Sequence, residues 1–324
     1  MLSTYISTAR GLARTEASGI QRIPDDVVWV DLLEPGAEEE RTVERELGID
    51  IPSREEMREI ETSNRLYEED GVLYMTTTIA AKLDTARPES TAVTFILANG
   101  KLITNRYIDT RPFQNFINYA ERHPGACNSS VSIFAGLVEA VTERIADTLE
   151  RVGSDLDAVS GNIFQTDPEA RKSKRDLRGL LERIGFNGEL NSKARESLVS
   201  LARLLVFVQQ SGNIALNDEH RHRFRSISRD AAALSDHASF LGAKVSFLLE
   251  ATLGLINLEQ NNIIKIFSVA AVMFMPPTLI ASIYGMNFRH MPELNWPVGY
   301  PLALLLMFGS ILGIYVYFKR RGWL

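Results

Sequence analysis

Amide, hydroxyl and small side chains recur every three or four residues near the C-terminal end of the chain. The set is Asn257, Asn261, Ile264, Ser268, Ala271, Met275, Thr278 and Ser282. These steps keep a residue on one face of a helix, so the set predicts a single line along it. Several copies around an axis could surround a water-filled pore with this line, whereas in one copy small residues could simply allow close helix packing. The spacing alone leaves both interpretations open.

Asn287 follows at the end of this helix, and its chemistry suits a cation that keeps its water. An amide presents an uncharged oxygen to the ion and an NH₂ group to a neighbour. Mg²⁺ dehydrates reluctantly and is commonly held through waters. A ring of carboxylates would bind it more tightly, but conduction requires that the ion also leave. A ring of amides is therefore a reasonable mouth for a pore that admits hydrated divalent cations.

Two apolar runs must position these residues. No charged residue occurs from Ile266 to Tyr284 or from Leu302 to Phe318. A helix needs about 20 apolar residues to cross a bilayer, so we predict membrane spans at residues 262–284 and 301–319. Pro276-Pro277 removes backbone donors inside the first span, which fits either a water-filled path or a simple packing kink.

Basic residues predict the orientation of the two spans. Lys265 precedes the first span, and Lys319-Arg320-Arg321 follows the second. The positive-inside rule places both of these ends in the cytoplasm. The loop 285–300 then lies outside, and the basic tail 320–324 lies inside together with the N-terminal bulk. We therefore expect a multi-pass protein of the cell (inner) membrane with both termini in the cytoplasm.

The part of the chain before the spans is acidic. Residues 1–261 hold 30 basic and 40 acidic residues, a net charge of −10. Such a surface disfavours nucleic acid as a partner and favours cations. Cys127 is the only cysteine, so no intrachain disulfide can form and a reducing compartment is expected.

Residues 1–130 have the pattern of an α/β domain. A strand is predicted at 27–32, a charged helix at 36–47, and further strands at about 71–83 and 91–98. Asn99-Gly100 joins the last strand to another at 101–107, which is a strong hairpin signal because both positions accept positive φ. The sequence contains no glycine-rich phosphate loop, metal cluster or nucleophile motif, so neither an enzyme nor an organic cofactor is predicted.

Residues 131–261 are predicted to form long stalk helices, at 131–165, 169–212 and 218–260. The last has a heptad seam of Ile227, Leu234, Leu241, Leu248 and Leu255, with Ala231, Ala238 and Val245 between them. No turn signal separates it from the first span, so one helix is expected from about 219 to 284, roughly 100 Å long. His220 and His222 are two residues apart in a charged stretch and are not favoured as metal ligands.

The loop between the spans carries a recognisable pattern. Tyr284-Gly285-Met286-Asn287-Phe288, followed by Met291-Pro292-Glu293-Leu294, resembles the signature of the CorA family of magnesium transporters. The resemblance extends upstream through EATLGLINLEQNNIIKIFSV and FMPPTLIASIYGMNF, and is dense over about 75 C-terminal residues. It implies an α+β membrane protein that forms a funnel-shaped homopentamer embedded in lipid, with the first span lining the pore.

The family resemblance also implies roles for single residues. Gly285, Met286 and Asn287 would form the outer ring that selects hydrated Mg²⁺. Asn261, Met275 and Thr278 match pore-lining positions, and Phe267 falls at a bulky apolar position of the hydrophobic gate.

The resemblance further implies gating by Mg²⁺ bound between cytoplasmic domains of neighbouring subunits. Glu250 matches an acidic gating position, and its partner would lie near Glu55 and Glu56. Mg²⁺ would thus be both the transported and the regulatory ion. When cytoplasmic Mg²⁺ falls, the acidic domains would spread and the long helices would transmit the movement to the pore.

The sequence is compatible with three functions. The first is a Mg²⁺ channel that also passes Co²⁺ and Ni²⁺, with influx driven by the membrane potential. The second is a zinc transporter of the same superfamily, which tends to carry Gly-Ile-Asn where this chain has Met286. The third is a cytoplasmic signalling domain merely anchored by two helices, which would need neither a continuous stalk nor an amide line.

Overall fold

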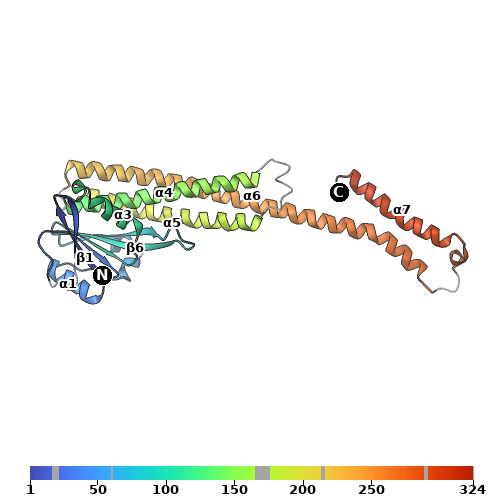
Figure 1. The fold of residues 1–324 in the computed structure, drawn as a ribbon, viewed down its shortest axis with the longest axis horizontal. Helices are drawn as coiled ribbons and strands as arrows, with labels where there is room; N and C mark the ends of the chain where they lie inside the picture. The colour runs from blue at the N-terminus through green and yellow to red at the C-terminus, as the bar shows by residue number, and fades with distance from the viewer. Residues whose placement is uncertain (17–21, 60, 165–175, 213–215, 288–290, 324) are drawn as a thin grey trace. The chain divides into compact units, whose positions relative to one another are not determined.

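The computed structural model describes residues 1–16, 22–59, 61–164, 176–212, 216–287 and 291–323. Its contacts divide the chain into two compact units, Met1–Leu249 and Glu250–Leu324. The first unit contains a seven-stranded sheet in the order β2-β1-β3-β7-β6-β5-β4. The strands are β1 (Leu2–Thr8), β2 (Gly11–Glu16), β3 (Val27–Leu33), β4 (Leu66–Glu69), β5 (Val72–Ala81), β6 (Glu89–Ala98) and β7 (Lys101–Arg106). Figure 1 shows the sheet with helices on both of its faces.

The sheet is antiparallel except where β3 and β7 pair in parallel. The predicted hairpin is confirmed: Ala98 pairs with Lys101 across a two-residue turn. Asn99 and Gly100 both have positive φ, 51° and 76°, which is the backbone that such a turn needs. The strands predicted at 71–83 and 91–98 correspond to β5 and β6, and their register is continuous from Leu73↔Leu97 to Ala81↔Glu89.

One face of the sheet packs against α1 (Ala37–Leu47). Val30 and Leu32 of β3 lie in an apolar cluster with Val43 of α1 and Ile96 and Ile103 of the neighbouring strands. Alternate residues of a strand point to opposite faces, so Trp29 and Asp31 face the other way. The helix predicted at 36–47 is confirmed as α1, and it covers the face of β3 that carries Val30 and Leu32.

The opposite face carries an aromatic layer. Trp29 stacks on Tyr5 with ring centroids 4.4 Å apart, and Phe95 lies 5.2 Å from Phe134 of α4 (Ser130–Phe164). Phe113 of α3 (Arg111–Ala120) lies 6.2 Å from Phe95. Burial raises the pKa of the Tyr5 hydroxyl to about 12, with a further contribution from the negative charge of Asp31. These contacts tie the helices to the sheet.

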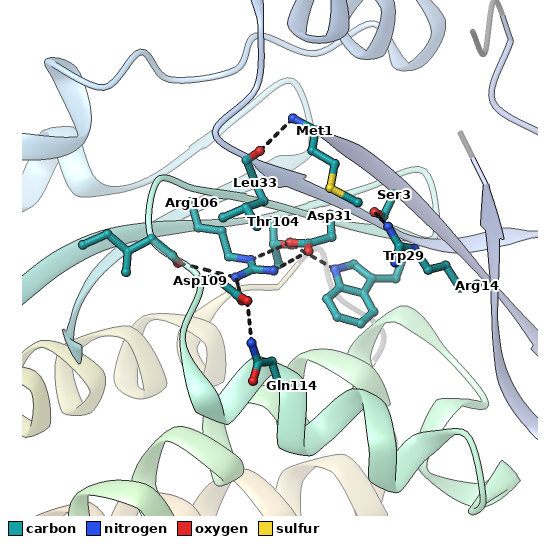
Figure 2. A network of polar contacts seen from close by, with 11 residues as sticks. Met1, Ser3, Arg14, Trp29, Asp31, Leu33, Thr104, Arg106, Asp109 and Gln114 are labelled. Atoms are coloured by element: carbon teal, nitrogen blue, oxygen red, sulfur yellow. Dashed lines mark hydrogen bonds and ion pairs between the residues drawn. The ribbon is translucent and has the colours of Figure 1, made fainter. Parts of the chain in front are cut away.

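A polar network crosses this aromatic layer (Figure 2). Arg106 of β7 donates to both carboxylate oxygens of Asp31 on β3, at 2.9 and 2.7 Å, and to Asp109 at 2.7 Å. Thr104 donates to Asp31 at 2.7 Å and accepts from the Trp29 indole at 3.0 Å. The side chains of Arg106 and Asp31 are each only 4% exposed. The ion pair is therefore buried and bidentate, and its carboxylate also accepts a hydrogen bond from the neutral Thr104 hydroxyl.

One further helix and the early part of another complete the first unit. They are α5 (Leu177–Gln210) and α6 (Asp218–Tyr284), of which residues 218–249 belong to this unit. Ser200 of α5 connects this helix to the sheet, because its Oγ accepts a hydrogen bond from the Thr78 N–H of β5 at 2.9 Å. The α/β domain and the long helices are thus packed together, and the boundary at residue 130 stays a prediction.

The predicted stalk helices agree with the observed ones where the chain is described. The helix predicted at 131–165 is α4, and α6 confirms one continuous helix from 218 to 284. The helix predicted at 169–212 is observed from Leu177, with Asp176 as its N-cap; positions 169–175 lie outside the described residues. Within α6, Ile227, Leu241 and Leu248 are at most 2% exposed, as the seam predicts.

A hydrogen bond and an ion pair show which helices α6 packs against along this seam. The Asn191 amide of α5 donates to the Ala238 carbonyl of α6 at 2.9 Å, and Lys244 of α6 contacts Asp157 of α4 at 2.6 Å. His220 does not serve as a free ligand, because its Nε2 lies 3.0 Å from the Ser132 hydroxyl.

Gly11 at the start of β2 has a backbone that only glycine adopts without strain, with φ of +133°. A Cβ there would lie 2.4 Å from the Ala120 carbonyl oxygen at the end of α3. We expect Gly11→Ala to destabilise the protein by more than about 1 kcal/mol, a fall in Tm of several degrees. Thermal unfolding of the purified protein measures it. Gly185→Ala in α5, where a Cβ would meet nothing within 4 Å, is the control and should leave Tm unchanged or higher. Equal melting of the two variants would contradict the clash.

Candidate ion-conducting site

The second unit consists of the rest of α6, the η4 turn (Pro292–Asn295) and α7 (Gly299–Arg320). Both helices are long and apolar enough to cross a membrane. Their side chains are almost all exposed in the single chain, which is the opposite of a core helix of a soluble protein. The two predicted spans are therefore present as helices, with α7 a few residues longer than the predicted 301–319.

The structure places the predicted pore-lining residues along the exposed surface of α6. Asn257, Asn261, Ile264, Ser268, Ala271, Met275, Thr278 and Ser282 are all exposed. Met275 is 67% exposed and Ile264 62%. Because the helix is unbroken, their steps of three and four residues do form one line. Phe267, 72% exposed, lies a quarter turn from that line, beside Ser268.

Exposure alone does not separate a pore face from a lipid face. Apolar side chains off the line are exposed as well, including Ile266 at 61% and Phe274 at 63%. The difference is one of chemistry: apart from Ile264 and Met275 the line holds amides, hydroxyls and small groups, whereas from Ile266 to Tyr284 the side chains off the line are apolar or aromatic. A hydrated ion can lie against the first kind of surface and not against the second.

The two prolines sit inside α6 without ending it. Pro276 and Pro277 have no N–H to give to the carbonyls of Val272 and Met273, which lose their usual helical donors. At the next residue, the Thr278 hydroxyl donates to the Phe274 carbonyl at 2.7 Å. The hydroxyl proton of Thr278 is therefore committed to the backbone, and its oxygen can only accept. That polarity suits the water shell of a cation, whose outer hydrogens need acceptors.

The outer motif begins where α6 ends. The Gly285 N–H donates to the Ala281 carbonyl at 2.9 Å and the Met286 N–H to Ile283 at 3.3 Å, closing the last turn. A Cβ on Gly285 would lie 3.0 Å from the Ala281 oxygen, so a larger residue would crowd this turn. Asn287 follows directly and is exposed. The amide is thus held at the end of the same helix that carries the polar line.

The rest of the outer loop is described in part. Residues 288–290 lie outside the described residues, as do the side chains of Glu293 and Leu294. Met291 is half-buried and Pro292 begins the η4 turn. The Gly299 N–H donates to the Trp296 carbonyl at 3.0 Å where α7 begins. The predicted roles of Met291, Pro292, Glu293 and Leu294 stay predictions.

Basic residues gather where α6 enters its apolar run and α7 leaves its own. Lys265 Nζ donates to the Gly322 carbonyl at 3.3 Å and lies 5.4 Å from the centre of the Trp323 ring. Lys319 lies over Tyr315 and Arg321 over Tyr317. The start of one span and the end of the other therefore meet, and α7 runs back along the direction of α6 (Figure 1). A positive belt with aromatic partners at one membrane face is typical of a cytoplasmic end.

The residues predicted to bind a regulatory ion are solvent-accessible. Glu250 is exposed on α6, and Glu55 and Glu56 are exposed around the short η1 helix (Glu56–Arg58). The Glu56 carboxylate accepts from the Ser53 N–H at 2.8 Å, and the Glu56 N–H donates to the Ser53 hydroxyl at 3.3 Å. The Ser53 backbone N–H, and then its hydroxyl, lower the pKa of Glu56. Glu56 therefore has a capping role of its own.

No group of three or more metal-binding side chains comes together in the described part of a single chain. Glu250 belongs to the second unit and Glu55 and Glu56 to the first. Each of these carboxylates can supply a ligand from its own surface, and their assignment as regulatory residues stays a prediction.

Comparison with known proteins places these features in a family. A seven-stranded α/β unit with long helices, followed by two apolar helices joined by a Gly-Met-Asn loop, defines a two-span membrane protein with a large water-soluble domain. The family model described as CorA-like Mg²⁺ transporter protein matches residues 24–320. The chain belongs to this family.

Relatives match along most or all of the chain. The Magnesium transport protein CorA of Salmonella typhimurium is 35% identical over 326 residues, covering 100% of both chains. The protein of the same name from Haemophilus ducreyi is 37% identical over 302 residues, covering 93% of each. The complete structure of the CorA magnesium transporter from Methanocaldococcus jannaschii covers 100% of this chain and 99% of its own, with a TM-score of 0.77 and 19% identity. The resemblance is confirmed, as is the predicted architecture of the chain: an N-terminal α/β domain, long helices and two C-terminal apolar helices. The family is one of transporters rather than enzymes.

Proposed function

We propose that the chain forms a homopentameric channel in the cell (inner) membrane through which Mg²⁺ enters, driven by the membrane potential. The observation that carries the proposal is the unbroken α6 helix, whose line of amide, hydroxyl and small side chains ends at the exposed Asn287. Five copies of that line would surround a path wide enough for an ion that keeps its water. Gly285, Met286 and Asn287 would form the selective ring at its outer end.

Electrostatics supplies the driving force. A divalent cation gains about 2 × 2.3 kcal/mol for each 100 mV of membrane potential. This is enough for accumulation without a coupled pump. The belt around Lys265, Lys319 and Arg321 supports an orientation with both termini in the cytoplasm, where the potential draws cations inward.

Polar groups without charge favour passage over capture. In the line, Asn261 and Thr278 offer oxygens that can accept hydrogen bonds from ion-bound water. Phe267 beside the line would narrow the path and gate it by excluding water. The same uncharged ring would admit Co²⁺ and Ni²⁺ with their water shells, whereas a tightly binding ring would hold them.

Uptake into proteoliposomes tests the proposal. Vesicles containing a Mg²⁺-sensitive dye and the purified protein are given a potassium diffusion potential, negative inside. Potential-dependent Mg²⁺ entry is expected. Zn²⁺ entry that follows a proton gradient, without Mg²⁺ entry, would replace the proposal by a zinc transporter, and no flux of either ion through folded protein would favour an anchored domain.

Regulation by cytoplasmic Mg²⁺ is the second part of the proposal. Residues 1–261 carry a net charge of −10, so five such regions around one axis repel one another. Mg²⁺ bound by Glu250 and by Glu55 or Glu56 of a neighbouring subunit would offset this repulsion and hold the channel closed. Loss of the ions at low Mg²⁺ would release the long α6 helices.

Neutral variants separate ion binding from structure. We expect Glu250→Gln to raise the cytoplasmic Mg²⁺ concentration needed for half-closure by about tenfold, equivalent to about 1.4 kcal/mol of binding. Glu56→Gln keeps an acceptor for the Ser53 N–H, so it should preserve the cap while weakening any ion contact. Flux measured against internal Mg²⁺ reports both effects. Glu219→Gln, exposed at the start of α6, is the control. If Glu250→Gln closes at the same Mg²⁺ concentration as Glu219→Gln, the assignment of Glu250 is wrong.

A further inference from the structure

We propose that the first unit binds a phosphate group in a pocket at the N-terminus of α3, apart from the ion path. The pocket has a volume of about 210 Å³. It is formed where the end of β5 and the turn after it meet the segment that enters α3, with Arg144 of α4 along one side. Its residues include Lys82, Asp84, Asp109, Thr110, Arg111 and Arg144.

Arginines outnumber the carboxylate on which they converge. Asp84 accepts from Arg111 at 2.6 Å, from Arg144 at 2.5 Å and from Arg151 at 2.6 Å. Hydrogen bonds from Arg151 and then Arg144 lower the pKa of Asp84, so the carboxylate is ionised at neutral pH. At Asp84, one negative charge therefore faces three positive ones, so positive charge is in excess there.

The second carboxylate of the pocket is already committed elsewhere. Asp109 accepts from Arg106 at 2.7 Å through one oxygen, and its other oxygen accepts from the Gln114 amide at 2.5 Å. Lys82 pairs with Glu89 at 3.0 Å. Because Arg106 also pairs with Asp31, Asp109 still contributes one negative charge. The three arginines around Asp84 therefore leave one net positive charge at the pocket.

Thr110 supplies the independent sign of a ligand. Its side chain is 3% exposed and lines the pocket, yet within the described part of the chain no group hydrogen-bonds to its Oγ1. A buried hydroxyl without a partner is costly, at roughly 1–3 kcal/mol. Thr110 is also the N-cap of α3, and its hydroxyl does not cap the helix. The hydroxyl is therefore available to an oxygen atom held in the pocket.

These groups together select a phosphate. A helix N-terminus attracts anions through its partial positive charge and its backbone N–H groups. Guanidinium forks match the oxygens of phosphate and can bind two of them at once. The volume of about 210 Å³ is below the roughly 300 Å³ at which pockets for drug-sized ligands begin. It therefore suits one phosphate group, either as the free ion or as the end of a larger soluble molecule.

Calorimetric titration of the full-length protein in detergent with inorganic phosphate tests the site. Saturable binding is expected, and Arg111→Gln should weaken it by about tenfold. Arg111 is 66% exposed, so this variant should fold normally. Thr110→Val, which keeps the shape and removes the hydroxyl, should weaken binding several-fold. Arg178→Gln in α5, whose arginine is 91% exposed, is the matched control and should bind like wild type.

A second titration, with AMP, distinguishes free phosphate from a phosphate group carried by a larger molecule. Binding of AMP at least ten times tighter than inorganic phosphate, and weakened by Arg111→Gln, supports a phosphate group carried by a nucleotide. Equal or weaker binding of AMP supports the free ion. No saturable heat with either probe, or binding that Arg111→Gln and Arg178→Gln change equally, overturns the site. None of these outcomes depends on Mg²⁺ flux, so the phosphate site can fail or hold independently of the proposed transport.

Discussion

Asn287→Ala is expected to reduce Mg²⁺ uptake at least tenfold while leaving the protein folded and assembled. The amide is exposed and directly follows the last turn of α6, so its removal costs little stability. In the proposed ring, every copy would lose its amide oxygen at once. Removing groups that orient a bound ion typically costs ten- to a hundredfold in affinity or activity, and a hydrated ion would lose its first specific contact.

The comparison that makes this result specific uses a second amide on the same helix. Asn262 is exposed and adjacent to Asn261 but lies off the polar line. Asn262→Ala removes the same chemical group and should transport at close to the wild-type rate. Both variants are measured by dye-reported uptake under the same potential. Full activity of Asn287→Ala, or equal losses in the two variants, would show that the outer ring is not where the ion is selected.

Asp31→Ala is expected to have the largest effect on stability, about 3–5 kcal/mol, because it leaves the Arg106 guanidinium buried without its partner. Burial would by itself lower the pKa of Arg106, but the hydrogen bonds and charge of Asp31 outweigh it and raise that pKa above its ordinary value. Without Asp31 the arginine keeps Asp109 and its position over the Phe113 ring, 4.6 Å away. Those contacts do not replace two bonds in a buried site. Tm should fall by roughly 10 °C.

An exposed ion pair provides the scale for this effect. Asp157 is 75% exposed and contacts Lys244 at 2.6 Å, so Asp157→Ala should cost no more than about 1 kcal/mol. The double variant Asp31→Leu with Arg106→Met should recover part of the lost stability, because a buried pair can often be exchanged for apolar groups. If the Tm of Asp31→Ala equals that of Asp157→Ala, the buried pair does not stabilise the first unit as described.

Local signals in the sequence predicted much of the fold. The Asn99-Gly100 turn needed only two residues that accept positive φ, and the structure has both. The apolar seam of α6 repeats every seven residues, and the spans are long runs without charge, so each could be predicted from neighbouring residues. These features depend on short-range periodicity and length.

Long-range pairings were not predicted. The strands β1 and β2 at the N-terminus were missed, and β1 pairs with β3 about 25 residues further on, from Leu2↔Leu32 to Ile6↔Val27. Asp31 and Arg106 occupy strands that are distant in sequence and adjacent in the sheet. The available signal was a charged residue at an inward-facing position of each strand. A buried charge needs a partner of opposite charge, so the two strands could have been predicted to be neighbours.

The candidate site was predicted as a line and a motif rather than as a cavity. The line on α6 is present, because its spacing is a property of one helix. A ring is a property of several copies, and the apolar and polar faces of α6 are exposed alike in one chain. The number of subunits and the proposed pairing of Glu250 with Glu55 or Glu56 depend on surfaces of a neighbouring copy, which no local pattern in the sequence specifies.

The reversal potential of currents through the purified protein in a planar bilayer is the most direct test of Mg²⁺ conduction. MgCl₂ is placed at a tenfold concentration difference across the membrane, with equal proton concentrations on both sides. A channel for this divalent cation should reverse near the Mg²⁺ equilibrium potential, about 30 mV for a tenfold gradient of a two-charge ion. The current should disappear in Asn287→Ala and persist in Asn262→Ala. A reversal that follows the chloride or proton gradient, or the absence of current through folded and assembled protein, would contradict potential-driven Mg²⁺ conduction.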